Sequence, residues 1–380
     1  MPPAWNCPLR MNKHFSLYLD LIRFVAALLV VLTHFCQHGI ISAAGQTFLP
    51  QFGREAVIVF FVLSGFVIAY TNGEKAVTAR QYAVARCARV YSVALPVLLV
   101  TLLAVAILTL GFDKQVNSAY QLNKPYIYLP LHLLFAGELW GLSETPPWLL
   151  PYWSLGYEVW YYTLFGVLFY ARGKARLALG AAVLLIMGPK LWLLLPVWVS
   201  GVLLYRYRGP LPISTREARL AWLATIAALL LYKLSGTDVA LRELGTALWP
   251  FHSFKLGSAD RYLADYVVCV LVVLNFLFAR HAQFSGLQRA AGPIRAVAAY
   301  TFTLYLTHAP VMGMWRAFYR HDNSRLLDIA ALSACIGVTC YLFGFITERR
   351  RATYRDWFDS LFALPARLAA FTAPSPRRPE

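Results

Sequence analysis

The chain contains few charged residues for its length. Asp, Glu, Lys and Arg make up 14% of its 380 residues, whereas a soluble domain contains about 25%. Hydrophobic residues make up 59%, and a soluble fold of this size has too little interior to bury so much apolar surface. Six cysteines, mostly within apolar runs, exclude a disulfide-rich secreted scaffold. The composition therefore favours a protein that crosses a membrane several times.

The sequence also lacks the short motifs of several enzyme classes. It contains no HExxH, no CxxC and no paired acidic run that would hold a metal ion. It contains no Walker loop and no GxGxxG after a strand, so nucleotide hydrolysis is not expected. No GxSxG elbow is visible either. We expect no metal site and no bound cofactor.

Acidic residues are scarce: 18 Asp and Glu stand against 35 Lys and Arg, which gives a formal charge of +17. In a soluble protein this charge would suggest nucleic-acid binding. Here the basic residues alternate with apolar runs and form no single face, which argues against a nucleic-acid partner. The pattern is typical of the cytoplasmic loops of a membrane protein.

Ten apolar runs predict an all-α, polytopic integral membrane protein with about ten transmembrane helices. The fifth, sixth and seventh runs are shorter than the ~20 residues that a span usually needs. A further stretch, residues 126–137, is apolar but short and contains Pro130, so we expect a re-entrant or interfacial element. The predicted spans are residues 17–36, 54–71, 91–111, 149–170, 175–188, 190–206, 218–234, 264–280, 298–317 and 326–347.

Most basic residues fall on one side of this arrangement, so the positive-inside rule places both termini in the cytoplasm. We expect a cytoplasmic tail at residues 1–14, a transmembrane domain at residues 15–350 and a basic cytoplasmic tail at residues 351–380. The first dozen residues and the stretch from about 366 read as unstructured ends. We expect no cleavable signal peptide and no soluble domain after the last span. The basic run Arg349, Arg350, Arg351 and Arg355 is most simply an anchor on anionic lipid.

Ionisable residues within spans are costly and are therefore functional candidates. The first span carries Asp20, Arg23 and His34. Arg23 and His34 are eleven residues apart, which places them on one helix face and roughly 16 Å apart along the axis. Asp20 lies one turn before Arg23 and can pair with it.

Candidates on the second and third predicted spans each have a plain structural alternative. In the second span, Ser64 and Gly65 are small enough to let helices approach closely, so Ser64 is either a packing residue or a substrate contact. Before the third span, Arg86 and Arg89 are one helical turn apart and can hold a phosphate together. Ordinary cytoplasmic charge explains this arginine pair equally well.

Candidates on the fourth and ninth predicted spans combine polar and aromatic side chains. Glu158 lies in an aromatic segment with Trp153 and Tyr157, an arrangement suited to sugar rings, although an interfacial aromatic belt is the alternative. His308 lies mid-span beside Tyr305 and needs a partner or a cavity; a core histidine bonded to a neighbouring helix is the alternative.

Together these segments resemble the bacterial membrane acyltransferase-3 family. The resemblance covers roughly residues 15–350, with one departure: after Arg89 the usual proline comes late, at Pro96. The motifs, in the family's order, are DxxR followed by ten residues and His (Asp20, Arg23, His34), FFxLSGF (residues 60–66), RxxR (Arg86, Arg89), WSLxxE (residues 153–158) and LYLxH (residues 304–308).

The resemblance implies an O-acyltransferase of the bacterial plasma membrane. Such an enzyme moves an acyl group, commonly acetyl, from acyl-coenzyme A to a hydroxyl of an envelope glycan or another exported molecule. The implied partners are acyl-coenzyme A as co-substrate, a glycan or lipid-linked saccharide as acceptor, and membrane lipids.

On this reading His34 is the general base for the acceptor hydroxyl. The other candidate catalytic residues are Arg23, Glu158, which would orient the imidazole or bond a sugar hydroxyl, and His308, which would stabilise the oxyanion or assist proton transfer. Direct transfer and an acyl-enzyme intermediate both remain open. The remaining candidates are Arg86 and Arg89 for the donor phosphates; Trp153, Ser154, Tyr157, Tyr305 and Ser64 for substrate; and Asp20 as the structural partner of Arg23.

Two other classes of function compete with this reading. Arg, Glu and His within spans also build the substrate path of a transporter or exporter. Inverted repeats would favour a transporter, and none is clear in the sequence. A non-catalytic scaffold for polysaccharide assembly is the second alternative, and it predicts that His34 and Glu158 are replaceable.

Overall fold

A computed structural model describes residues 11–74, 77–112, 116, 118–207, 209, 211–251 and 254–372, with side chains described as far as residue 363. The chain is 80% helical, and the described residues contain no strand, which confirms the all-α prediction. Parts of both predicted tails, residues 1–10 and 373–380, lie outside the described residues.

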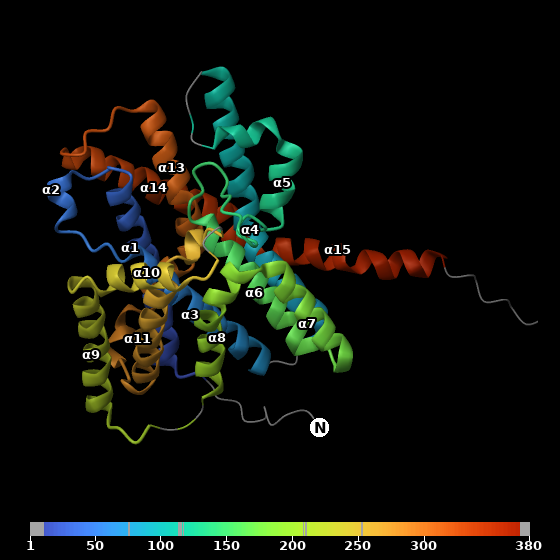
Figure 1. Ribbon diagram of the computed structural model, residues 1–380, viewed down its shortest axis with the longest axis horizontal. Helices are drawn as coiled ribbons and strands as arrows, with labels where there is room; N and C mark the ends of the chain where they lie inside the picture. The colour runs from blue at the N-terminus through green and yellow to red at the C-terminus, as the bar shows by residue number, and fades with distance from the viewer. Residues whose placement is uncertain are drawn as a thin grey trace, which may run out of the picture.

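The helices form one bundle, from which the C-terminal helix α15 projects (Figure 1). The α-helices are α1 (Lys13–Gln37), α2 (Ala43–Gln46), α3 (Gly53–Glu74), α4 (Ala79–Ala106), α5 (Pro125–Leu133), α6 (Tyr152–Tyr170), α7 (Gly173–Met187), α8 (Pro189–Arg206), α9 (Thr215–Leu234), α10 (Thr237–Leu248), α11 (Tyr262–His281), α12 (Ala291–Ala298), α13 (Thr301–Phe318), α14 (Leu326–Ile346) and α15 (Arg351–Thr372). Short 3₁₀ or π segments are η1 (Ile107–Gly111), η2 (Ala119–Asn123), η3 (Gly257–Ala259), η4 (Ser285–Ala290) and η5 (Glu348–Arg350).

Each predicted span coincides with a helix, but the count of ten spans is not confirmed. Among the described residues, five helical segments are long and apolar enough to cross a membrane: α1, α3, α4 with η1, α11, and the segment from α14 into α15. Two bent pairs raise the number to seven if each is one span. Helices α7 and α8 meet at 117°, and α9 and α10 meet at 68°.

The difference from ten spans has physical causes. Helix α7 has 15 residues, about 22 Å at 1.5 Å per residue, which is shorter than a hydrocarbon core of about 30 Å. It turns into α8 at Gly188, whose φ of 74° a glycine adopts without strain. Helices α6 and α13 carry many aromatic and polar side chains, which lower their mean hydropathy, and much of α13 is buried in the bundle.

The structure adds two local details and corrects one expectation. Helix α4 extends the predicted third span toward the N-terminus as far as Ala79, because Thr78 and Gln81 form a capping box, and Arg86 and Arg89 therefore lie within one continuous helix. Pro130 does not break the helix α5, which has nine residues and is too short to span a membrane. Helix α15 continues to Thr372, past residue 366, where the sequence predicts an unstructured end.

Helices α3 and α8 cross at very short distance. A Cβ atom on Gly65 would lie 2.0 Å from the carbonyl oxygen of Trp198, and one on Gly201 would lie 1.9 Å from that of Val62. Only glycine fits at both positions, as expected of small residues where helices touch. This crossing fixes α3, which carries Ser64, against α8.

Candidate active site

Seven side chains that the sequence singles out line one small cavity between α1, α3, α4, α6 and α13. We call it the arginine cavity; its volume is about 70 Å³. Tyr162 and Thr301 also face it. Its predicted members are Arg23, Ser64, Arg86, Arg89, Ser154, Glu158 and Tyr305.

Glu158 is held at one wall of the arginine cavity by hydroxyl groups. The Ser64 hydroxyl donates to Glu158 Oε1 at 2.6 Å, and the Tyr162 hydroxyl donates to the same oxygen. The indole of Trp198 donates to Ser64 Oγ at 3.2 Å. Tyr162 is one helical turn after Glu158, so α6 brings both to the same face. Ser64 is therefore engaged on both sides and fixes the carboxylate.

The arginines of the cavity come from two helices. Arg23 on α1 is 3.9 Å from Asp20, the partner that the spacing suggests. Arg89 interacts electrostatically with Glu158 and Arg23. Arg86 lies over the ring of Tyr162 at 5.8 Å, and its buried Nε has no hydrogen-bond partner among the described residues. A buried donor without a partner is costly, so this guanidinium is suited to an additional anion.

His34 and His308 form a direct pair between α1 and α13. His34 Nδ1 is 2.7 Å from His308 Nε2, and the two rings stack with centroids 5.0 Å apart. His308 is completely buried, whereas His34 is partly exposed. Of the two rings, His34 is therefore the one with accessible surface.

The hydrogen bonds assign a tautomer to this pair. His308 Nδ1 is 2.9 Å from the carbonyl oxygen of Leu304, which can only accept, so Nδ1 carries the proton. In neutral His308 the other nitrogen, Nε2, is then an acceptor, and His34 must donate to it from Nδ1. This assignment, inferred from the hydrogen-bond network, leaves Nε2 of neutral His34 with a free lone pair. That lone pair is what a general base requires.

A second and larger cavity, of about 540 Å³, lies on the other side of the histidine pair. We call it the His38 cavity; its lining includes His38, Trp148 and Arg316. The ring of His38 contacts that of His34 edge-on, with centroids 5.9 Å apart. Trp148 lies against Gly313 of α13, where a Cβ atom would be 2.5 Å from the indole ring.

The histidine pair lies between the two cavities along both of its helices. On α1, Arg23 lines the arginine cavity and His38 lines the His38 cavity, and His34 is between them. On α13, Tyr305 lines the first cavity and Met312 the second, and His308 is between them. Neither histidine is itself part of the lining of either cavity.

Five predicted site residues line neither cavity: His34, His308, Asp20, Trp153 and Tyr157. The ring of Trp153 is covered by Arg54 at 4.7 Å, so one aromatic face is already occupied. Tyr157 is completely buried, and its hydroxyl is 2.9 Å from Ser258 Oγ, which in turn donates to Glu138 Oε2 at 2.6 Å. Ser154 faces the arginine cavity and is 2.7 Å from the hydroxyl of Tyr305.

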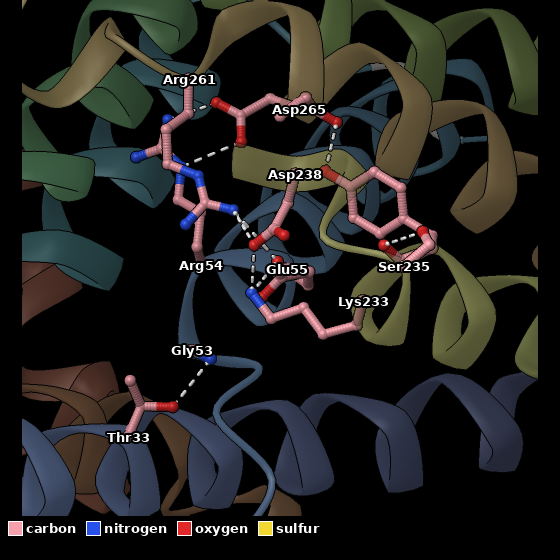
Figure 2. A network of polar contacts seen from close by, with 11 residues as sticks. Thr33, Gly53, Arg54, Glu55, Lys233, Ser235, Asp238, Arg261 and Asp265 are labelled. Carbon is pink, nitrogen blue, oxygen red and sulfur yellow. Dashed lines mark hydrogen bonds and ion pairs between the residues drawn. The ribbon is translucent and has the colours of Figure 1, made fainter. Parts of the chain in front are cut away.

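A buried ion network fixes the first turn of α3 (Figure 2). Arg54 pairs with Asp265 of α11. Glu55 is 3.1 Å from Lys233 and 3.4 Å from Arg261. Asp238 is 2.6 Å from the same Lys233 and 3.1 Å from the same Arg261. These three cations face three carboxylates, so the network has no surplus charge.

The same turn of α3 is tied to α1 beside the histidine. The backbone N–H of Gly53 donates to Thr33 Oγ1 at 2.8 Å, as Figure 2 shows. Thr33 directly precedes His34 in the chain. The network therefore supports the position of the histidine without touching it.

Sequence reasoning missed several residues of the two cavities. Tyr162 and His38 each follow a predicted residue by one helical turn, so their spacing was a usable signal. Trp148 and Arg316 are far apart in the sequence, and only the folded chain brings them to one cavity. Among the described residues, no group of three or more His, Cys, Asp or Glu is placed to hold a metal ion.

Comparison with known proteins gives one family match. A family model described as an acyltransferase domain, that of the acyltransferase 3 family, matches residues 16–348, nearly the whole chain. The matched range agrees with residues 15–350, over which the five motifs resemble the same family. No curated protein and no solved structure gives a significant match.

Proposed function

Because the chain belongs to the acyltransferase 3 family, we propose that this membrane acyltransferase transfers an acyl group, commonly acetyl, from cytoplasmic acyl-coenzyme A to a hydroxyl of an envelope or exported glycan. The observation that carries the proposal is the position of the His34–His308 pair between the two cavities. A donor and an acceptor that cannot share one compartment can meet at such a point.

In the proposed reaction His34 acts as the general base. Its Nε2 takes the proton of the acceptor hydroxyl, and the oxygen attacks the thioester carbonyl carbon. The carbon–sulfur bond then breaks, and the leaving thiolate takes the proton back from the His34 imidazolium. The products are the acyl ester and free coenzyme A, and the histidine returns to its starting state.

His308 acts in this scheme as a positioning residue. Its buried ring accepts from His34 Nδ1, which fixes the orientation of the His34 ring and keeps its Nε2 unprotonated before the reaction. When His34 becomes an imidazolium, its Nδ1–H keeps the hydrogen bond to His308 Nε2. No contact between His308 and the substrate is needed.

The arginine cavity is the proposed end point of the donor. Arg86 and Arg89, with Arg23 nearby, supply the charge that binds phosphate groups. Glu158 balances part of that charge and is itself held by Ser64 and Tyr162. The hydroxyls of Ser154 and Tyr305 face the same cavity.

The His38 cavity is the proposed entry of the acceptor. Its volume of about 540 Å³ suits a saccharide unit, and Trp148 offers an aromatic surface. With both termini cytoplasmic in a bacterial plasma membrane, this cavity opens to the outer side, where envelope glycans are found. The transmembrane acyltransferase domain then comprises residues 15–350.

The proposal is tested by replacing the base. We expect His34→Ala to lower acyl transfer by about 10²–10⁴-fold, the usual contribution of a general base. The assay is mass spectrometry of envelope glycans from a strain that lacks the protein and is complemented with wild type or variant. His14→Ala, a change at the start of α1 outside both cavities, serves as the control.

Two results would contradict the proposal. Full acylation by a well-inserted His34→Ala variant would remove the histidine from the chemistry. Uptake of the saccharide by proteoliposomes without any acyl donor would identify a transporter instead.

A further inference from the structure

A fourth arginine interacts electrostatically with the arginines of the cavity without lining it, and it comes from the C-terminal helix. Arg351 is the first residue of α15. Its side chain is 40% exposed overall, yet its Nε atom is buried and has no hydrogen-bond partner among the described residues. Arg351 thus repeats the feature seen at Arg86, the other guanidinium with an unpaired buried Nε near this cavity.

Arg351 is an electrostatic neighbour of all three cavity arginines, Arg23, Arg86 and Arg89. Its own ion pair is with Glu348, at 3.5 Å. Glu348 is shared, because it also accepts from the backbone N–H and the hydroxyl of Thr303, at 3.3 and 3.0 Å.

Four guanidinium groups that interact with one another favour the binding of an anion. Like charges at short range repel one another, and a partly buried site screens that repulsion poorly. The ion network of Figure 2 has as many carboxylates as cations. The four arginines, by contrast, have three carboxylates: Asp20 and Glu348 form ion pairs with them, and Glu158 interacts with Arg89 electrostatically. Guanidinium clusters of this kind are the usual binding site for phosphate.

The fold holds Arg351 in place. Helix α15 packs against α4 through Phe358, which contacts Val84 and Ala88. One turn of α4 earlier, Arg80 forms an ion pair with Asp359 at 3.0 Å. Arg351 is therefore carried by a helix that packs against α4, the helix that carries Arg86 and Arg89.

We infer that Arg351 completes a phosphate-binding site with Arg23, Arg86 and Arg89, and that the site takes the phosphate groups of a nucleotide, the coenzyme A part of the donor. The inference rests on the proposed function, since it uses the same donor. This role differs from the one that the sequence alone suggests for the basic run, which is an anchor on anionic lipid. Both ligands offer phosphate, so the experiment has to separate them.

The test measures coenzyme A binding by the full chain in nanodiscs of neutral phosphatidylcholine, by titration calorimetry. We expect Arg351→Gln to raise the Kd for coenzyme A by about ten- to a hundredfold, the range for one lost charge-assisted hydrogen bond or two. Arg351→Lys should keep most of the affinity because it keeps the charge. Arg355→Gln is the matched control: it removes the same charge from the same helix at an exposed position one turn later.

A second measurement separates nucleotide binding from a structural role. The dependence of log Kd on salt concentration should be shallower for Arg351→Gln than for wild type, while both proteins unfold at the same temperature without ligand. A shared loss of affinity in Arg351→Gln and Arg355→Gln would indicate unspecific surface charge and would overturn the inference.

Three other outcomes are distinguishable. If wild type binds coenzyme A and Arg351→Gln binds it equally well, the inference is wrong and the proposed donor stands. If that variant instead loses only a response to added phosphatidylglycerol, Arg351 binds lipid headgroups, and the inference is again wrong. If wild type binds no coenzyme A at all, the inference and the proposed function fail together.

Discussion

At the scale of the residue, a backbone carbonyl decides which histidine nitrogen is available for chemistry. The carbonyl oxygen of Leu304 accepts from His308 Nδ1 and so fixes the proton there. His308 Nε2 is then an acceptor, and His34 Nδ1, at 2.7 Å, must be the donor. The second step cannot be deduced from the LYLxH motif alone, because the two histidines are on different helices.

This relay predicts different effects for two substitutions of His308. His308→Phe removes the acceptor for His34 Nδ1 and should lower kcat about 10²-fold, with the KM for the donor unchanged. His308→Gln offers an amide oxygen as acceptor and should restore a large part of kcat. Steady-state kinetics of both variants checks this, and equal kcat values for the two would argue against a positioning role.

A second prediction concerns Ser64, whose hydroxyl serves both Glu158 and Trp198. Ser64→Ala leaves buried polar groups without a partner and should lower the free energy of unfolding by about 1–3 kcal/mol. Thermal unfolding in detergent measures the loss. Ser333→Ala is the control, because the Ser333 hydroxyl bonds only the carbonyl of Ile329 on an exposed face of α14; a similar loss in both variants would contradict the prediction.

The residues of α6 show how far sequence reasoning reaches. Helical spacing separates Trp153 and Tyr157 from Ser154 and Glu158, since each pair is four residues apart and lies on its own stripe. The spacing does not say which stripe faces the cavity. Packing of α3 against α6 decides that, and it leaves the aromatic pair beside Arg54.

At the scale of the element, the start and the contacts of a helix depend on features that hydropathy does not register. The capping box at Thr78 extends α4 by more than two turns and so places Arg86 and Arg89 within it. The bend between α7 and α8 depends on Gly188 and the packing around it. Apolar runs predict where helices are, and they do not predict how many of them cross.

The crossing of α3 and α8 gives the prediction at this scale. Gly65→Ala would place a methyl group against the carbonyl oxygen of Trp198, a backbone atom that cannot rotate away. We expect it to lower the free energy of unfolding by about 1–3 kcal/mol, the usual cost of overpacking. Thermal unfolding checks the change.

Gly337→Ala is the matched control. It lies in the helix α14 with no atom within 4 Å of the added methyl group, and should be neutral or stabilising by about 0.5–1 kcal/mol. If Gly65→Ala behaves like Gly337→Ala, the two helices do not touch as described.

At the scale of the whole molecule, the proposal requires the two cavities to face opposite sides of the membrane. The positive-inside pattern predicts this orientation. The sequence does not determine the number of spans, because a count of apolar runs does not detect bent helix pairs or buried helices with many polar residues. Single cysteines can test the orientation directly.

We expect an impermeant thiol reagent to label Asn323→Cys, in the loop between α13 and α14, from outside intact cells. Ser360→Cys, at an exposed position on α15, should react only after the membrane is permeabilised. Labelling of both positions from the same side would contradict the proposed arrangement.

The arginine cavity has one more consequence. Its roughly 70 Å³ is far below the volume of about 300–1,000 Å³ that a small-molecule site usually has. Under the proposed function, the helices that line it must therefore move apart before the donor can enter.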